Sequence, residues 1–344
     1  MVRAVGGRTG LHKLMTASIE AATPAAIIAA ADVLRAGGLV AFPTETVYGL
    51  GADAGNPDAV RAIFTAKGRP ADHPVIVHVH ELAAAKRWAR EFPEGARRLA
   101  DAFWPGPLTL ILPRAAHVSD AVTGGQDSVG LRVPSHPVAR ALLAAFGAIA
   151  APSANRFGRI SPTTAQHVAD DMGDELALIL DGGPCPVGIE STIVSFAGVE
   201  PALLRPGSIG IEALARVLGR APQTADASAP RASGTLASHY APMTRTTLAA
   251  PGALQLEILR RVERDEVVAV LARTATRPRE FGGLWITAPA GPDAYAHDLY
   301  ANLRTLDAER ADEILIESLP PDPEWFAVHD RLVRAAHGSE DDRD

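Results

Sequence analysis

The sequence predicts an α/β protein of two domains joined by a linker. Between residues 37 and 219, short apolar runs rich in β-forming residues alternate with helical stretches, which is typical of helices packed on a mixed sheet. The chain has 344 residues, whereas one domain usually has about 100–200. Residues 220–238, which read RAPQTADASAPRASGTLAS, lack apolar periodicity and favour a flexible tether. We therefore expect the first domain to end at residue 219.

The first domain, residues 16–219, is expected to contain eight strands with helices between them. Asn56-Pro57 supplies an N-cap and a proline at the first helical position, and Gly68 follows the last turn of that helix. Ser161-Pro162 is expected to open another helix, which closes at Gly173. The predicted strands are 39–42, 75–79, 108–112, 129–133, 148–151, 176–180, 191–195 and 202–204.

The second domain, residues 245–338, is expected to be a smaller α/β unit. Residues 220–244 are expected to form the linker, and residues 1–15 are expected to be an N-terminal extension. Residues 339–344, which read SEDDRD, are expected to be an acidic solvated tail. The predicted elements of the second domain are helix 253–263, strands 267–271 and 284–287, helix 293–309, strand 313–317 and helix 323–336.

Composition excludes several classes of protein. The only cysteine, Cys185, can form neither an internal disulfide nor a multi-cysteine zinc site. The net charge is −7, so nucleic-acid binding would need a local basic patch. No apolar run approaches the ~20 residues of a membrane span, and no secretory signal stands at the start. We expect a cytoplasmic protein that does not act at a membrane.

Polar side chains follow several predicted strands of the first domain. The sequence has no GxxxxGK[ST] loop, GxGxxG turn, GxSxG elbow, HExxH or paired CxxC motif. Instead, cations and hydroxyls stand at strand and helix ends, where open α/β sheets bind ligands. These cations and hydroxyls predict an anion-binding concavity formed by Thr44, Thr46, Lys67, Arg69, Arg132, Ser153, Asn155 and Arg205, with His78 on a neighbouring strand.

Each of these residues also has an ordinary structural explanation. The threonines can be β-formers at a turn, and Lys67 and Arg69 can be cations at a helix C-terminus. His78 can be a hydrogen-bonded core histidine, and Ser161 can serve as an N-cap. Arg132 is harder to explain in this way, because a cation inside an apolar strand is costly unless an anion meets it. His239-Tyr240 can be a docking turn or part of a segment that folds back.

Ten motifs in order resemble one known family, the long form of the YrdC-type threonylcarbamoyl-adenylate synthases. The resemblance spans about 230 residues and implies a twisted-sheet catalytic domain around a positive cavity. It also implies a linker that reaches back as an active-site lid and a smaller Rossmann-like C-terminal domain. The motifs are PTETVYGLG at 43–51, KGRP at 67–70, PVIVHV at 74–79, WPGPLTLIL at 104–112, VGLRVP at 129–134, PSAN at 152–155, SPTT at 161–164, IEST at 189–192, LLRPG at 203–207 and SHYAP at 238–242.

The resemblance implies a nucleotidyltransferase that condenses L-threonine, bicarbonate and ATP, with Mg²⁺, to threonylcarbamoyl-adenylate and pyrophosphate. The product would feed the threonylcarbamoyl modification of the tRNA adenosine next to the anticodon. The implied partners are a downstream tRNA threonylcarbamoyl transferase complex and, weakly or indirectly, RNA. No residue is expected to hold a metal by itself.

The resemblance also implies roles for individual residues. Lys67, Arg69, Ser153 and Asn155 would be catalytic, and Tyr240 would close over the nucleotide. His73 stands where the family pattern has asparagine, and it can donate one hydrogen bond but lacks the paired amide groups. The implied ATP site is Lys67, Arg69, His73, Ser128, Ser153, Asn155, Ser161, Arg205 and Tyr240. The implied L-threonine site is Thr46, His78, Arg132, Ala151 and Ser191.

Three other functions are compatible with parts of this sequence. A non-catalytic RNA-binding module could use the same basic cavity, although the first 219 residues carry 19 basic and 20 acidic side chains and few aromatics. A carbamoyl-transfer maturation enzyme would pair this domain with zinc-binding cysteines, which the single cysteine disfavours. A regulatory protein that binds ATP without turning it over would have the same sequence features, and only an activity assay would distinguish it from the enzyme.

Overall fold

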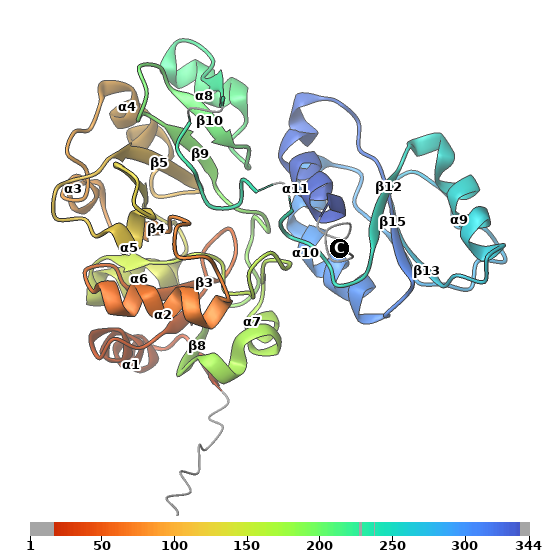
Figure 1. The fold of residues 1–344 in the computed structure, drawn as a ribbon, viewed down its shortest axis with the longest axis horizontal. Coiled ribbons are helices and arrows are strands. Elements are labelled where there is room, and N and C mark those ends of the chain that lie inside the picture. The colour runs from red at the N-terminus through yellow and green to blue at the C-terminus, as the bar shows by residue number, and fades with distance from the viewer. Residues whose placement is uncertain (1–16, 227–228, 237, 338–344) are drawn as a thin grey trace, which may run out of the picture.

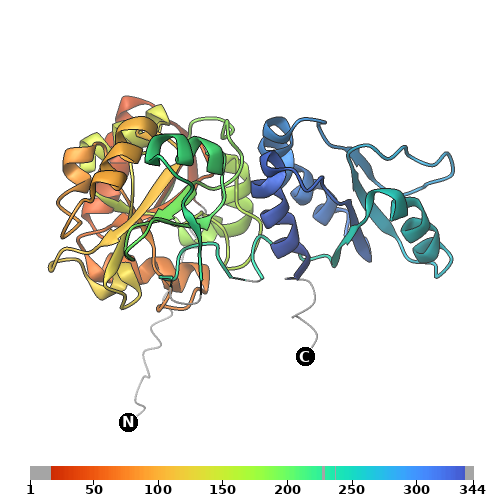
Figure 2. The same ribbon diagram turned by 90° about the horizontal axis from the view of Figure 1, so that it is seen from above.

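The computed structural model describes residues 17–226, 229–236 and 238–337, which form two units that lie side by side (Figures 1 and 2). The first unit holds one large sheet and the second a smaller one. The predicted extension 1–15 and tail 339–344 lie outside the described residues. Within the described ranges, no helix is long and apolar enough to cross a bilayer.

The first sheet is mixed, as predicted, in the order β1-β8-β2-β3-β7-β4-β6-β5-β9-β10-β11. Five of its strand pairs are parallel and five antiparallel. Its strands are β1 (Ser18–Ala21), β2 (Val40–Phe42), β3 (Gly49–Asp53), β4 (Ile76–His78), β5 (Leu108–Pro113), β6 (Ser128–Arg132), β7 (Ile149–Ala150), β8 (Leu178–Asp181), β9 (Thr192–Ser195), β10 (Ala202–Arg205) and β11 (Gln223–Thr224).

Three strands of this sheet were not predicted: β1, β3 and β11. Strand β3 has the sequence GLGAD, and its glycines suggested a loop through residue 51. The glycines are needed because the strand lies close to its neighbours. A Cβ on Gly51 would lie 2.9 Å from side-chain atoms of both Phe42 and Ile149. Packing between strands, which local sequence does not show, therefore overrides the turn signal.

The helices of the first unit begin and end mostly where capping residues predict. Asn56 Oδ1 accepts hydrogen bonds from two backbone amides of α2, and Gly68 ends that helix in the left-handed conformation. The prediction that Ser161 caps a helix is wrong, because Thr164 is the N-cap of α7. The helices are α1 (Pro24–Arg35), α2 (Pro57–Lys67), α3 (Leu82–Ala85), α4 (Glu94–Phe103), α5 (Asp120–Thr123), α6 (Pro137–Phe146), α7 (Ala165–Met172), η1 (Gly173–Glu175) and α8 (Ile211–Leu218).

Two faces of the first sheet are covered differently. One face packs against α2, α4, α5, α7 and α8 in a single large core. The opposite face packs against α1 and α6 at its β2-β7-β8 end. At its β4-β5-β9-β10 end, however, that face packs against Ala232 and Ala229 of the linker. The linker therefore takes the place of a helix layer, and the predicted flexible tether is instead packed on the sheet in its described residues.

The second unit contains a four-stranded sheet in the order β12-β15-β13-β14, with every pair parallel, as expected of a Rossmann-like unit. Helices α10 and α11 cover one face and α9 the other. Its first strand, β12, was not predicted. The elements are β12 (Thr246–Ala249), η2 (Pro251–Ala253), α9 (Leu254–Val262), β13 (Val268–Ala272), β14 (Trp285–Thr287), α10 (Pro292–Ala308), β15 (Glu313–Glu317), η3 (Pro323–Trp325) and α11 (Phe326–His337).

Candidate functional site

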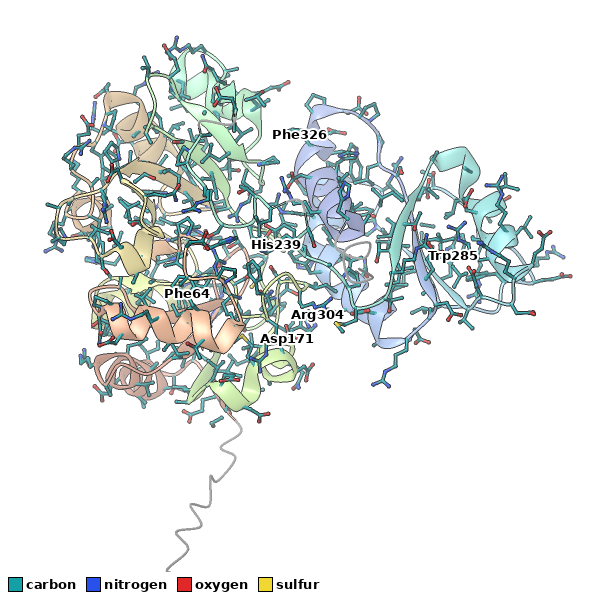
Figure 3. The ribbon with its side chains drawn as sticks, viewed as in Figure 1. Phe64, Asp171, His239, Trp285, Arg304 and Phe326 are labelled. Atoms are coloured by element: carbon teal, nitrogen blue, oxygen red, sulfur yellow. The ribbon has the colours of Figure 1, made fainter. Side chains whose placement is uncertain are left out.

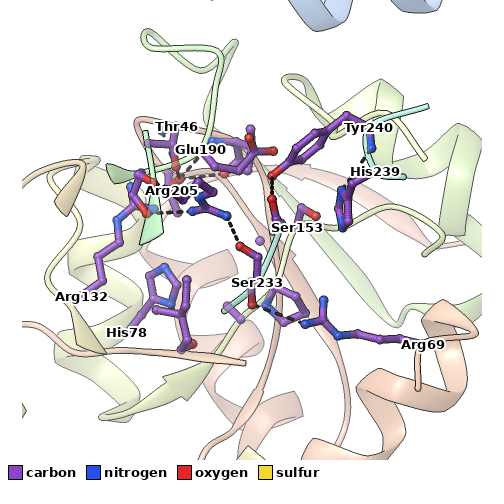
Figure 4. A pocket seen from close by; sticks show the side chains of 18 residues that line it. Thr46, Arg69, His78, Arg132, Ser153, Glu190, Arg205, Ser233, His239 and Tyr240 are labelled. Carbon is purple, nitrogen blue, oxygen red and sulfur yellow. Dashed lines mark hydrogen bonds between the residues drawn. The ribbon is translucent and has the colours of Figure 1, made fainter. Parts of the chain in front are cut away.

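A cavity opens at the polar ends of the central strands, beneath the linker. Eighteen residues line it, and Figure 4 shows their side chains converging from both the sheet and the linker. They come from the β2–β3 loop, β4, β6, the segments around β7, β9 and β10, and residues 233–240. The cavity therefore lies where the linker replaces a helical cover.

Two arginines of the cavity hold the linker. Arg205 Nη1 donates to the carbonyl of Ser233 at 2.8 Å, and Arg69 Nη2 donates to the Ser233 hydroxyl at 3.4 Å. Arg205 also donates to the carbonyl and hydroxyl of Ser191, at 3.0 and 3.1 Å. Burial, together with the nearby Arg205, lowers the pKa of Arg69 to about 10, so both groups stay charged at neutral pH. A neutral serine thus stands between two cations that could bind an anion.

Arg132 meets a buried anion, Glu45, that the sequence analysis did not assign. Arg132 Nη2 lies 2.7 Å from Glu45 Oε1, and each side chain is 5% exposed. Burial opposes ionisation of Glu45, but the charge and hydrogen bond of Arg132 outweigh it and hold the carboxyl pKa below its ordinary value. Among the described residues, no partner takes the buried Nε of Arg132 or of Arg69. Each arginine therefore has one buried N–H group that no described residue accepts.

His78 lies beside Arg132 because the parallel register of β4 and β6 pairs these two residues. Its Nδ1 is 3.2 Å from the carbonyl oxygen of Ile76, within the same strand. Burial and the adjacent Arg132 charge lower its pKa to about 3. His78 is therefore a neutral imidazole at physiological pH, suited to hydrogen bonding rather than to carrying charge.

Tyr240 closes the cavity from the linker side. Its side chain is buried, and its hydroxyl donates to the carbonyl of Gly234 at 3.4 Å. Gly234 has φ +76°, and a Cβ there would overlap the Tyr240 hydroxyl, so only glycine fits. Its neighbour His239 packs edge to face on Tyr240 with ring centroids 4.3 Å apart. The linker thus folds back, and the ring of Tyr240 lies over the cavity (Figure 4).

Nine of the predicted site residues line this cavity. All five residues of the predicted threonine set are among them, together with four of the predicted ATP set. Thr46 is held by a 2.8 Å hydroxyl contact with Thr44, and Ser191 by one of 2.8 Å with Thr109. The nine are Thr46, Arg69, His78, Arg132, Ala151, Ser153, Ser191, Arg205 and Tyr240.

The other five predicted residues are not among the described residues that line the cavity. Lys67 Nζ donates to the carbonyls of Ser153 and Asn155, so it shapes the loop of residues 153–155. Burial lowers the pKa of Lys67 well below its ordinary value, and the Arg69 charge adds to this effect. Asn155 Nδ2 donates to the carbonyls of Arg156 and Arg159, 2.7 and 2.8 Å away. Both residues support the cavity from behind.

His73, Ser128 and Ser161 are also placed elsewhere. His73 is half-buried and packs edge to face on Phe157, with ring centroids 5.4 Å apart. Ser128 lies in a separate hollow beside the β9–β10 turn and the start of the linker. Ser161 is fully buried and donates to Glu190 at 2.6 Å. None of these three side chains is among the described residues that line the cavity.

Several residues at the site were missed by the sequence analysis. Glu45 and Glu190 stand inside the motifs PTET and IEST, so a search for acidic partners of the predicted cations could have found them. Ser233 and Arg331 carry no local signal, because their contacts join segments far apart in the chain. No cluster of three or more His, Cys, Asp or Glu residues suited to a metal occurs in the described ranges.

The chain is similar to known proteins along both of its domains. The family model described as "Telomere recombination" matches residues 32–207, and that described as "Threonylcarbamoyl-AMP synthase, C-terminal domain" matches residues 209–337. The chain is 41% identical over 325 residues to the threonylcarbamoyl-AMP synthase of Bacillus subtilis, covering 91% of this chain and 93% of the relative. It is 37% identical over 322 residues to the Pyrococcus abyssi enzyme of that name, covering 89% and 93%.

The fold is similar to that of solved structures. The crystal structure of P. abyssi Sua5 complexed with L-threonine superposes with a TM-score of 0.86 at 36% identity, over 92% of this chain and 96% of that one. At this coverage the similarity extends over both domains.

Proposed function

This chain belongs to the threonylcarbamoyl-AMP synthase family, and we propose that its cavity condenses L-threonine, bicarbonate and ATP to threonylcarbamoyl-AMP and pyrophosphate. One observation carries the proposal furthest: Arg69, Arg132 and Arg205 converge on one cavity, and two of them keep a buried donor without a partner in the described chain. Such donors favour an anionic ligand, since a buried unpaired N–H is costly.

L-Threonine would occupy the side of the cavity near Arg132. The Arg132 Nε would donate to its carboxylate, while Glu45 keeps the guanidinium oriented. Neutral His78, Thr46 and Ser191 would supply hydrogen bonds without adding charge. The complex of P. abyssi Sua5 with L-threonine supports this assignment, because that protein shares the fold of this chain.

ATP would occupy the side near Arg69 and Arg205. Its phosphate oxygens would replace Ser233 on the two guanidinium groups, because charged acceptors bind arginine more strongly than neutral ones. Tyr240 and the linker would then lie over the nucleotide and exclude water. Lys67 and Asn155 would act from behind, by fixing the loop of residues 153–155.

The reaction needs orientation rather than a protein nucleophile. The threonine amine and bicarbonate form a carbamate with loss of water. A carbamate oxygen then attacks the α-phosphorus, the α–β phosphoanhydride bond breaks, and pyrophosphate leaves. The arginines would stabilise the charge on the phosphates, and the closed linker would protect the carbamate and the mixed anhydride from hydrolysis.

Mg²⁺ would accompany ATP. In the part of the chain that the structure describes, no metal-binding cluster of acidic or imidazole groups exists. Phosphate oxygens of the bound nucleotide and waters would supply most of the ligands of Mg²⁺. The ion would reduce the negative charge of the triphosphate, and no side chain is assigned to it.

The product would serve the tRNA modification implied by the family. We propose that threonylcarbamoyl-AMP is consumed by a downstream tRNA threonylcarbamoyl transferase complex in the cytoplasm, with RNA contacted only weakly or indirectly. The mixed anhydride is the activated form of the carbamoyl group, so a transferase that presents the adenosine amine must follow.

Pyrophosphate release tests the proposed function. The purified chain is assayed with ATP, Mg²⁺ and bicarbonate, and with L-threonine, D-threonine, L-serine or no amino acid. Release should require L-threonine and bicarbonate. Arg69→Met should abolish it, while Arg61→Met, which removes an exposed cation from α2, should leave it unchanged. If ATP binds but no condition releases pyrophosphate, the synthase proposal fails for this chain.

The same protein should be tested against the RNA-binding alternative. Phosphate-driven RNA affinity falls steeply with ionic strength. Fluorescence anisotropy with labelled tRNA at about 50 and 200 mM salt would detect it. Tight, strongly salt-dependent binding without pyrophosphate release would favour the RNA-binding module.

A further inference from the structure

One carboxylate, Glu190, joins the two domains at the wall of the cavity. Glu190 Oε2 accepts from Arg331 Nε at 2.9 Å and from the Tyr300 hydroxyl at 2.8 Å. On the side of the first domain, Ser161 donates to Oε1 at 2.6 Å. Arg331 and Tyr300 belong to α11 and α10, so the second domain supplies both of these partners.

Arg331 reaches from α11 to residues that form the cavity wall. It is completely buried, and its Nη1 donates to the carbonyl of Pro206 at 2.8 Å, directly after Arg205. Its guanidinium carbon lies 5.3 Å from the ring centroid of Tyr240. A single side chain of the second domain therefore contacts both the segment that carries Arg205 and the ring that closes the cavity.

Tyr240 is supported by the second domain rather than by the linker alone. Its ring centroid lies 5.7 Å from that of Tyr300, with 32° between the ring planes. Its backbone has φ +62°, which a tyrosine adopts only when its surroundings impose it. Tyr240 and Tyr300 also share one apolar cluster with Ile189. These contacts supply the constraint that the linker conformation requires.

The domain junction is close at this point. A Cβ on Gly188, whose φ is +81°, would overlap the carbonyl oxygen of His297 in α10. The backbone of the loop that leads to Glu190 therefore lies directly against α10. A shift of the second domain would move Glu190, and with it the cavity wall.

We infer that Arg331 and Tyr300 are positioning residues for the synthase site: through Glu190 and the ring of Tyr240, they set the closed position of the linker over the nucleotide. Neither residue is among the described residues that line the cavity. The inference rests on the proposed function for its kinetic consequence, although the position of the linker can be measured without turnover. It assigns the second domain a part in ATP binding, and it predicts a much smaller effect on threonine binding.

A second ion pair across the same junction provides a matched control. Arg304 of α10 makes a two-pronged contact with Asp171, at 2.6 and 3.0 Å (Figure 3). Its other hydrogen bond goes to the carbonyl of Ile160, at 2.6 Å, so its described polar contacts do not involve Glu190 or the Tyr240 hydroxyl. If Arg331 acted only by holding the domains together, Arg304→Lys and Arg331→Lys would have similar effects. A lysine keeps the charge at each site but loses the planar fork.

The kinetic experiment measures KM for ATP, kcat, and the Kd of L-threonine by calorimetry. Arg331→Lys should raise KM for ATP at least fivefold and change the threonine Kd less than twofold. Tyr300→Phe, which deletes one hydroxyl and keeps the ring, should shift KM in the same direction by about two- to fivefold. Arg304→Lys should leave KM for ATP within twofold.

Limited trypsin digestion of the full chain supplies a readout that needs no activity. Arg231 is exposed in the linker, two residues before Ser233, and cleavage after it cuts the chain between the two domains, so each fragment carries one of them. Arg331→Lys and Tyr300→Phe should accelerate this cleavage, and Arg304→Lys should not. Equal effects of Arg331→Lys and Arg304→Lys on KM and cleavage, or no effect of Arg331→Lys and Tyr300→Phe, would overturn the inference.

The two proposals fail in different ways. Should the wild-type chain release no pyrophosphate, the proposed function fails and the digestion rates still decide whether Arg331 and Tyr300 hold the linker. If Arg331→Lys does not fold, judged by its thermal transition, Tyr300→Phe alone decides between the outcomes.

Discussion

Replacing Arg132 with methionine should destabilise the first domain strongly. The substitution keeps much of the apolar stem but removes the guanidinium that lies 2.7 Å from Glu45. Glu45 would then be left with backbone amide donors, that of Ser135 at 3.0 Å from its Oε2 among them, while remaining buried. An ionised carboxylate without its cation in such a place carries the full cost of desolvation.

The size of the effect follows from the burial of the pair. Both side chains are 5% exposed, so solvent screens them little. Removing one partner of a buried pair costs about 3–5 kcal/mol. For a domain of this size, that corresponds to a fall in the melting temperature of roughly 6–20 °C. The double variant Glu45→Gln/Arg132→Met removes both charges and should be at least about 1 kcal/mol more stable than Arg132→Met.

Differential scanning calorimetry measures these differences, and isothermal calorimetry with L-threonine measures the functional consequence. The control is Arg61→Met, which breaks an ion pair whose two side chains are 60% and 86% exposed and should cost less than about 1 kcal/mol. L-Threonine affinity should fall about 10- to 150-fold in Arg132→Met, the value of a charge-assisted hydrogen bond. The reasoning is refuted if Arg132→Met is as stable as the control or if the double variant is less stable than the single one.

Three further predictions concern protonation and the linker. Burial opposes ionisation of Glu190, but the charges of Arg331 and Arg205 and its hydrogen bonds outweigh burial and lower its pKa to about 2. Glu190→Gln should therefore lower the free energy of unfolding by about 3 kcal/mol at neutral pH. This loss, measured by urea unfolding, should shrink as the pH falls from 4.5 towards 2. Burial lowers the pKa of His78 to about 3, so below pH 6.5 the unfolded chain takes up a proton that the folded chain does not. Wild-type stability should therefore fall as the pH drops from 6.5 to about 4, and His78→Gln should reduce this fall. An unchanged dependence of the free energy of unfolding on pH in the variant would contradict the reasoning. Gly234→Ala would place a methyl group on the Tyr240 hydroxyl and should reduce pyrophosphate release at least tenfold, while L-threonine binding by calorimetry stays within twofold.

Elements with strong local signals could be predicted from the sequence. Helix α2 begins and ends where Asn56 and Gly68 indicate, and the mixed sheet follows from the alternation of apolar runs and helices. The start of α7 was misplaced because Ser161 and Thr164 are both good capping residues. The competition is decided by Glu190, which accepts the Ser161 hydroxyl. A tertiary contact thus selected the cap.

The candidate site was predicted in part. Residues at strand ends, such as Thr46, His78 and Arg132, line the cavity because the sheet brings those ends together. Lys67 and Ser128 carry equally suggestive positions in the sequence, yet Lys67 points behind the 153–155 loop and Ser128 lies in another hollow. The direction of a side chain depends on the residues packed around it, and a sequence motif does not specify those neighbours.

Short-range signals in the chain establish the α/β class, most of the helices and strands, and the family, because caps, periodicity and motifs act over a few neighbouring residues. Long-range packing selects which anion each buried cation meets. Arg132 and Glu45 are 87 residues apart, and Arg331 and Glu190 are 141 apart. Such pairs form because packing buries both charges at the same place in the fold. The residues that neighbour each partner in the sequence therefore do not indicate which charge it meets.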